Sequence, residues 1–438
     1  MSTTGAPDRP DLVERARLAP SVWGALTVGL ICFVVAFLLS RLELLAVATP
    51  LVISAVGAVL FAPRESRAHV IVADTHDEGG QTTTVVARVE NAEHAQAVQL
   101  RIEPRTGSVS NVFITPRAAG TLRFTALAGH SGPQILLTFQ GRSIGADASW
   151  VAEPGPPVHA QRLFYPMVRP LRSLPTPHHL LGLTGLHLSE RPGSGGEFHD
   201  IDAYRPGDRI RRIDWRATAK HSPERGELYV RRTTATSDTA IQLVIDASVE
   251  VTGVVDEWAS HVLSAGVSSL DLAREAAASF AVGYATLGDR VGFDDFSDAS
   301  RTIPARSGAR HRDRVIRAIA QTQVRASIAE RVRAPRFAPG AIVFIFSTFL
   351  DAYVVGFIQR WVASGHPVVV VDTLPDRDAR GLDQKDRLAL RVVELERNLR
   401  LDGLRSAGVD IVSWSRVQGG EPPVWSSRNN AGRVAGQR

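Results

Sequence analysis

Residues 241–248 read Ile-Gln-Leu-Val-Ile-Asp-Ala-Ser, in which a mainly apolar run ends at the acidic residue Asp246. Such a run is typical of a strand that is buried on both faces of a parallel sheet. Two more runs of this kind follow, AIVFIFS at 341–347 and PVVVVD at 367–372. Helical periodicity separates the runs, so the pattern predicts a three-layer, doubly wound α/β domain over residues 239–415.

The same domain has further expected elements. Helices are predicted at 269–287, 309–322, 351–363 and 384–406, and strands at 289–296 and 409–414. In open α/β sheets, ligands bind where the carboxyl ends of the strands meet. The residues that follow Ile245 and Ile345 therefore lie at the expected binding edge.

Two apolar stretches without ionisable side chains lie near the N-terminus, at 22–39 and 44–62. At about 1.5 Å per residue, a helix of either length approaches the roughly 30 Å thickness of a bilayer core. We expect a transmembrane hairpin over residues 21–63; a buried helical hairpin of a soluble protein is the alternative.

Basic residues flank the expected hairpin on both sides. Arg15 and Arg17 precede it, and Arg64 and Arg67 follow it. The positive-inside rule therefore predicts a two-helix plasma-membrane protein with both termini in the cytoplasm.

Residues 68–160 show a period of two, with short runs such as TTTVVARVE and AVQLRIEP between turn residues. This pattern predicts a small all-β, sandwich-like domain. No cluster of histidines or carboxylates stands out in it, so we expect a scaffold. Residues 1–20 are expected to form a cytoplasmic tail, 161–238 a linker with a dense polar segment, and 416–438 a disordered tail.

The composition narrows the possible functions. The chain of 438 residues has a net charge of +5 with both signs dispersed, which argues against a dedicated nucleic-acid binder. The single cysteine, Cys32, excludes an intrachain disulfide and a cysteine-based zinc site. The sequence has no Gly-x-Ser-x-Gly nucleophile elbow and no phosphate-binding loop. We therefore expect a protein that is not an enzyme.

The polar segment 196–217 has specific residues at fixed spacing, and it is similar to the signature of the domain of unknown function 58 family. The matching residues are Phe198, Tyr204, Pro206, Gly207, Asp208, Arg211, Arg212, Asp214, Trp215 and Arg216. The α/β part resembles a von Willebrand factor A domain, a doubly wound Rossmann-type fold that family members carry after the signature. Together with the hairpin and the β domain, the resemblance covers nearly the whole chain.

The resemblance implies a bacterial, membrane-anchored partner of MoxR-type AAA+ ATPases, a pairing thought to assemble, activate or insert metal into other protein complexes. It implies no catalytic reaction. We therefore expect a cytoplasmic adaptor that binds such an ATPase and an unknown client protein through its von Willebrand A-like domain. Two other functions stay open, an outward-facing adhesion receptor and a metal-dependent enzyme.

A von Willebrand A domain can hold a divalent ion through an Asp-x-Ser-x-Ser loop and ligands from later loops. Asp246 and Ser248 match that loop here, and Glu250 stands in place of the second serine. Asp351 follows the 341–347 strand, with Thr348 where an aspartate is often found. Because hard oxygen ligands suit Mg²⁺, Asp246, Ser248, Glu250 and Asp351 form a degenerate candidate Mg²⁺ site. The alternative is a polar strand end that caps the following helix.

The signature segment has two interpretations. Its arginines can bind an anion, because guanidinium groups match carboxylate and phosphate geometry. Alternatively, arginines and aspartates pair to fix an irregular crossing of the chain, with Tyr204 and Trp215 packed as anchors. Either arrangement is compatible with a docking surface for the ATPase. The Arg-rich region 301–336 predicts a solvated helical face, with contact to anionic lipid headgroups as the alternative.

Overall fold

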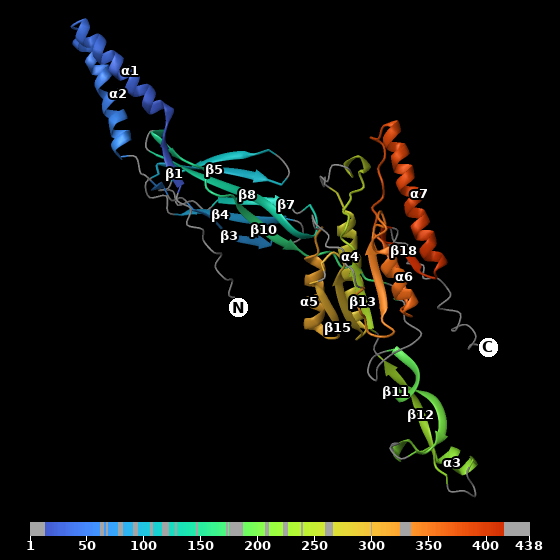
Figure 1. Cartoon of the computed structure of the whole chain (residues 1–438). Helices are drawn as coiled ribbons and strands as arrows, with labels where there is room; N and C mark the ends of the chain where they lie inside the picture. Colours follow the sequence, from blue (N-terminus) through green and yellow to red (C-terminus); the bar gives the residue numbers. More distant parts are fainter. Residues whose placement is uncertain are drawn as a thin grey trace. The chain divides into compact units, whose positions relative to one another are not determined.

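A computed structural model describes residues 14–415, with gaps at 62–64, 67–68, 78–81, 91–94, 106–107, 116–121, 128, 146–147, 172–173, 175–186, 206–209, 222–226, 238–239, 259–265, 299 and 325–333. The chain divides into two compact units. The first consists of Met1–Ala128 and Gln134–Arg162, and the second of Gly129–Pro133 and Leu163–Arg438. Figure 1 shows their elements in sequence colours.

The first unit begins with a helical hairpin, α1 (Pro20–Leu38) and α2 (Leu42–Phe61) (Figure 1). Every seventh residue of α1 is buried, namely Val22, Gly29 and Ala36. A Cβ added at Gly29 would lie 2.9 Å from Val52 Cγ2 and 3.4 Å from the Ala48 carbonyl oxygen, so the two helices approach closely there. Small residues at such an interface are how apolar helices pack when no hydrophobic force drives them together.

The outward faces of α1 and α2 are apolar and exposed, with Phe37 at 81% and Leu60 at 71%. Both helices are long and apolar enough to cross a membrane. The two predicted hairpin helices are therefore confirmed as elements.

Two antiparallel sheets follow in the first unit. One has the order β2-β1-β9-β8-β5-β6, with β10 also paired to β8, and the other has the order β3-β4-β7. Phe124 of β7 and Phe139 of β8 pack with ring centroids 5.5 Å apart, so the inner faces of the sheets meet. The strands are β1 (Glu14–Leu18), β2 (Glu65–Ser66), β3 (His69–Asp77), β4 (Thr82–Glu90), β5 (Ala97–Pro104), β6 (Ser110–Ile114), β7 (Leu122–Leu127), β8 (Gly132–Ile144), β9 (Trp150–Ala152) and β10 (Val158–Phe164).

Strand β1 is a feature that the sequence pattern did not reveal. Part of the expected N-terminal tail pairs with the β domain, with Leu18 opposite Trp150 and Glu14 opposite Ser66. Both ends of the α1–α2 hairpin are therefore joined to one sheet.

The second unit contains a six-stranded sheet in the order β15-β14-β13-β16-β17-β18. All neighbours are parallel except β14 and β15, which are antiparallel. The elements are β13 (Ala240–Ile245), α4 (Ser269–Thr286), β14 (Arg290–Asp295), β15 (Thr302–Arg306), α5 (Ala309–Ala320), β16 (Ile342–Ser347), α6 (Val355–Ala363), β17 (Val368–Asp372), α7 (Gln384–Ser406) and β18 (Asp410–Ser413). The predicted helices and parallel strands are confirmed, and the antiparallel edge strand β15 is an addition.

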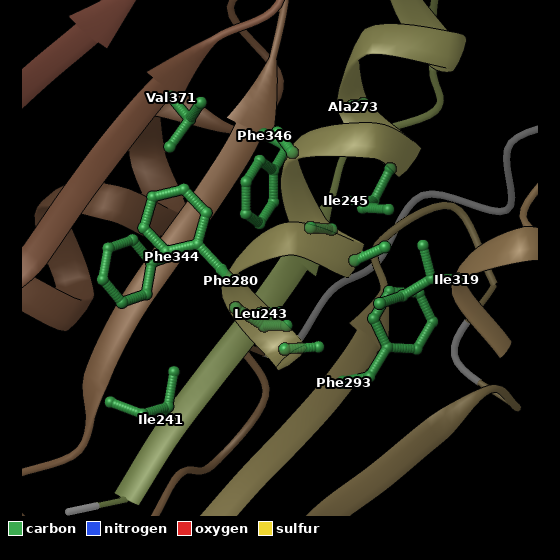
Figure 2. Close-up of a cluster of buried hydrophobic side chains, with 14 of the residues drawn as sticks. Ile241, Leu243, Ile245, Ala273, Phe280, Phe293, Ile319, Phe344, Phe346 and Val371 are labelled. Atoms are coloured by element: carbon green, nitrogen blue, oxygen red, sulfur yellow. The ribbon is translucent and has the colours of Figure 1, made fainter. Parts of the chain in front are cut away.

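Helices cover both faces of this sheet because its central strands are apolar on both sides. Ile241, Leu243 and Ile245 of β13 pack in one core with Phe280 of α4 and Ile319 of α5, as Figure 2 shows. Alternate residues of β13 and β16, Val244 and Ile345 among them, face a second core with α6 and α7. Side chains at successive strand positions point to opposite faces, so one continuous apolar run supplies both cores.

Part of the segment expected as a linker, 161–238, is regular structure. A two-stranded antiparallel ribbon joins β11 (His187–Ala203) to β12 (Tyr229–Ser237). The short helix α3 (Trp215–His221) lies in the connection between these strands. The many glycines and prolines of this region suggested a connector, but the ribbon accommodates them through three register shifts.

Candidate binding site at the carboxyl end of the parallel sheet

The candidate site lies where β13 and β16 end side by side. If the six strands are numbered by their order in the chain, they lie across the sheet in the order 3-2-1-4-5-6. The connections therefore leave β13 and β16 in opposite directions. Such a switch point leaves room for a ligand beyond the strand ends. Asp246 directly follows β13, and Ser347 is the last residue of β16.

Hydroxyl groups connect two carboxylates at this point. Ser347 Oγ donates to Asp246 Oδ2 at 2.7 Å, and the Ser248 amide donates to Asp246 Oδ1 at 3.1 Å. Ser248 Oγ donates to Asp351 Oδ2 at 2.9 Å. The structure therefore brings together three of the four residues predicted as metal ligands, Asp246, Ser248 and Asp351.

Asp246 is in an unfavourable environment for a negative charge. Its side chain is buried, and burial raises the pKa of its carboxyl above the usual value. The negative charge of Asp351 raises the pKa further, while hydrogen bonds from Ser248 and Ser347 partly offset both effects. A bound cation would remove the repulsion between the two carboxylates.

The loop that carries Asp351 is held rigidly. Phe349 has a φ of 56°, a left-handed conformation that is rare for a bulky residue, and its side chain is buried in the core beneath α6 and α7. Its amide donates to Ser347 Oγ at 3.1 Å. Left-handed residues of this kind cost about 1–3 kcal/mol and persist only where packing fixes them, often at binding sites.

Two arginines of α7 also hold this loop. Arg397 is buried, donates from Nε to the Thr348 carbonyl at 2.7 Å and pairs with Asp372 at 2.5 Å. Arg400 donates to the Leu350 carbonyl at 2.9 Å. No sequence pattern indicates either role, because both arginines lie within an ordinary polar helix pattern.

Glu250 has a different position from the one predicted. It accepts a hydrogen bond from Ser268 Oγ at 2.6 Å, and Ser268 is the N-cap of α4, with Asp271 as the reciprocal partner in a capping box. Among the described residues, no group of three or more His, Cys, Asp and Glu side chains converges as a metal site. Asp246, Ser248, Ser347 and Asp351 offer oxygen donors at the strand end, all of the hard type that Mg²⁺ prefers.

A second acidic group lies at the end of the neighbouring strand β14. Asp295 is 2% exposed, and burial raises the pKa of its carboxyl to about 6. Arg301 lowers this pKa, and Asp298 and Asp294 raise it. Ser297 Oγ accepts from the amide of Ala247, which joins this strand end to the Asp246 loop. Residues 289–296 were predicted as a strand, but no role in the site was predicted for them.

The signature residues lie mainly in and around the β11–β12 ribbon. Phe198 pairs with Thr233 across it, and the Tyr204 amide donates to the Leu228 carbonyl. Pro206, Gly207 and Asp208 lie outside the described residues. Arg211 and Arg212 form a single 3-10 turn before α3.

Trp215 and Asp214 differ from the expected packed arrangement. The Trp215 side chain is 67% exposed, so the prediction of a packed anchor was wrong. Asp214 instead accepts from the amides of Arg216 and Ala217, at 3.1 and 3.0 Å, as a cap at the start of α3. Within this segment, Arg205 pairs with Asp202 at 3.6 Å.

Comparison with known proteins connects the ribbon and the sheet. Residues 200–408 match a family model described as "Protein of unknown function DUF58". The DUF58 match thus begins in β11 and ends after α7, and it contains Asp246, Ser347 and Asp351.

Curated relatives are mycobacterial. Rv1480 of Mycobacterium tuberculosis and Mb1516 of Mycobacterium bovis, both described as uncharacterized proteins, are each 29% identical over 266 residues. In each case the alignment covers 57% of this chain and 79% of the relative.

Proposed function

We propose that this chain is a membrane-anchored binding module whose α/β unit captures a partner protein at the carboxyl end of its sheet. The helices α1 and α2 form the anchor. Strands β1 and β2 hold the two ends of the hairpin beside each other, which suits a hairpin that enters and leaves a bilayer on one side. The arginines at both flanks favour the cytoplasmic side.

The observation that carries the proposal is the pair of carboxylates, Asp246 and Asp351, joined through Ser248 at the switch point of the sheet. The strand order with one antiparallel edge supports the likeness to a von Willebrand factor A domain. If the domain works as a von Willebrand factor A domain does, Asp246, Ser248 and Asp351 hold Mg²⁺. The ion then offers an open coordination position to a carboxylate of the partner.

A MoxR-type AAA+ ATPase is the partner class that the resemblance of the signature segment implies, with a client complex as the target of the pair. The ribbon offers a second contact surface. Trp215 and Ile210 are 67% and 70% exposed beside Arg211, and tryptophan and arginine dominate the energy of many protein interfaces. Large apolar side chains exposed beside arginines support docking more than a purely structural role.

Co-purification tests the binding proposal. The full chain, extracted in detergent from its own cells, should recover a MoxR-type ATPase, and Mg²⁺ and ATP should change the recovery. Asp246→Asn removes the charge and keeps one acceptor oxygen for the Ser248 amide, while its NH2 group can donate to Ser347 Oγ. The variant should therefore lower recovery about tenfold, a change of about 1.4 kcal/mol. Asp376→Asn, at an exposed residue that follows β17, is the matched control. Equal recovery with both variants would contradict the proposed site.

Reporter fusions test the anchor independently of the partner. A reporter placed after residue 63 and another at the C-terminus should both give a cytoplasmic signal. An external signal at either position would reverse the orientation and favour the adhesion receptor. Titration of the detergent-solubilised chain with Mg²⁺ in a calorimeter tests the ion, and the absence of binding heat would remove the ion from the proposal.

A further inference from the structure

Helix α7 exposes a row of large apolar side chains. Leu388, Val392, Leu395 and Leu399 are 63%, 51%, 61% and 64% exposed. The opposite side of the helix is buried against the sheet, through Arg397, Leu401 and Leu404. The fold of the second unit thus uses one face of α7 and leaves an equally apolar face in solvent (Figure 1, red helix).

The spacing of the exposed residues is that of a coiled-coil seam. They follow one another at intervals of four, three and four residues, which is the alternation of d and a positions in a heptad. Leu388 and Leu395 occupy d, while Val392 and Leu399 occupy a. Leucine at both d positions with the β-branched Val392 at one a position favours two parallel strands, whereas Leu399 at the other a position is not β-branched.

The seam ends sharply on both sides. The next a position before Leu388 is Lys385, and the next d position after Leu399 is Asp402. The apolar row therefore spans about three helical turns. A partner helix of the same length and pattern would cover it completely.

Charged residues beside the seam identify that partner. Arg391 occupies a g position and Glu396 the e position that follows it, and both are exposed. In a parallel pair, g of one helix faces the following e of the other, so each Arg391 meets the Glu396 of the second copy. In an antiparallel pair g faces g and e faces e, so Arg391 meets Asn398 and Glu396 meets Ala389. Only the parallel alignment of two identical helices pairs opposite charges.

The flanking charges also argue against a lipid surface as the occupant. Helix α7 carries six basic and four acidic residues. Arg377, Arg400 and Arg405 form ion pairs with Glu394, Glu396 and Asp402 of this helix. A helix that lies on anionic lipid usually has a predominantly basic polar face. Mixed charge is typical of the flanks of a helix pair.

We propose that α7 pairs in parallel with α7 of a second copy of this chain, through Leu388, Val392, Leu395 and Leu399. A seam of about three turns is weak by itself, since isolated short helices gain little from pairing in water. Two copies anchored in one bilayer, as proposed above, meet at a raised effective concentration. The membrane anchor and the seam then act together.

Disulfide cross-linking in membranes tests the pairing. The single native cysteine is first removed by Cys32→Ser, and Leu388→Cys is then introduced at a d position. Oxidation should give a cross-linked dimer, because equivalent d positions face each other in a parallel pair. Arg387→Cys is the matched control, since it is exposed, adjacent in sequence and directed away from the seam at a c position. It should cross-link at the background level, and lipid dilution should leave the ratio of the two yields unchanged.

Charge reversal tests the alignment. Arg391→Glu should lower the yield from Leu388→Cys about tenfold, because two attractive contacts become repulsive. Adding Glu396→Arg in the same chain should restore the yield. A purely structural role for either residue would not give this rescue.

Four results would overturn the proposal. The first is equal cross-linking of Leu388→Cys and Arg387→Cys, which indicates random collision. The second is cross-linking only between copies with Leu388→Cys and copies with Leu399→Cys, which indicates an antiparallel pair. The third is no cross-link while a maleimide labels Leu388→Cys freely, which indicates an uncovered helix. The last is no cross-link while the thiol of Leu388→Cys is also protected from maleimide. That result indicates that lipid, another protein or another segment of this chain covers the seam.

Discussion

Replacing Asp295 by asparagine should stabilise the α/β unit near neutral pH and leave its stability unchanged near pH 4. Asp295 ends β14, is 2% exposed, and has its pKa raised to about 6 by burial. Ionising the carboxyl in this buried position costs free energy in the folded protein. The unfolded chain has no such cost, because its carboxyl is in water. Asparagine keeps an oxygen for the Ser297 amide, which donates to Asp295 Oδ1 at 3.1 Å.

The magnitude follows from the pKa difference. The usual value is 3.8 and the folded value is about 6, so the shift is about 2 units, or about 3 kcal/mol. Because the folded pKa lies above the unfolded one, the cost is full above about pH 6 and disappears as the pH falls below about 4. The gain from Asp295→Asn should therefore be about 3 kcal/mol at pH 7.5 and close to zero at pH 4.

Hydrogen exchange of the full chain in detergent measures the gain in stability strand by strand. Amides of β13 and β14 should exchange about 100-fold more slowly in the variant than in the wild type at pH 7.5, since about 1.4 kcal/mol corresponds to a factor of ten. Amides of β5 and β8, in the first unit, serve as the internal control. Asp313→Asn, at an exposed residue of α5, is the control substitution and should change nothing. An equal change at pH 4 and pH 7.5 would refute the ionisation argument.

Three further predictions concern the anchor, the loop and the ribbon. Gly29→Leu should separate α1 from α2, because even a Cβ there lies 2.9 Å from Val52 Cγ2, and cysteines placed in facing positions should then stop cross-linking. Arg397→Met should destabilise the second unit by about 3 kcal/mol, because it removes a buried arginine and leaves Asp372, whose side chain is 16% exposed, without its ion-pair partner, and the apparent Tm should fall. Trp215→Ala should change Tm little, since the side chain is 67% exposed, yet weaken ATPase recovery; a large fall in Tm would show that Trp215 is structural.

The sequence predicted an element most closely where its residue pattern is compatible with only one kind of structure. The run Ile241–Ile245 is buried at every position, and its neighbours in the sheet are equally apolar, so periodicity located β13, β16 and β17 closely. The helix predicted at 384–406 has those same bounds. The exposed leucines of α7 were visible in the same sequence, but periodicity alone does not tell which apolar face a fold buries.

The candidate site was predictable only in part. Asp246, Ser248 and Asp351 follow strand ends that the pattern could locate, and parallel strands bring such ends together. Glu250 was placed in the site by sequence proximity, whereas the chain turns after Ser248 and directs it to the N-cap of α4. The support from Arg397 could not be foreseen, because it depends on which face of α7 meets the loop after β16.

Strand β1 has a consequence for how this protein is made. Its partner β9 is synthesised much later, since Leu18 pairs with Trp150. At about 5–20 residues per second, the ribosome needs roughly 7–26 s to bridge that interval. If α1 and α2 insert as proposed, they do so while β1 still lacks β9, the one of its two partner strands that lies far along the chain. Membrane insertion then precedes closure of the first sheet, and the residues before α1 must stay on the synthesis side of the bilayer until Trp150 emerges.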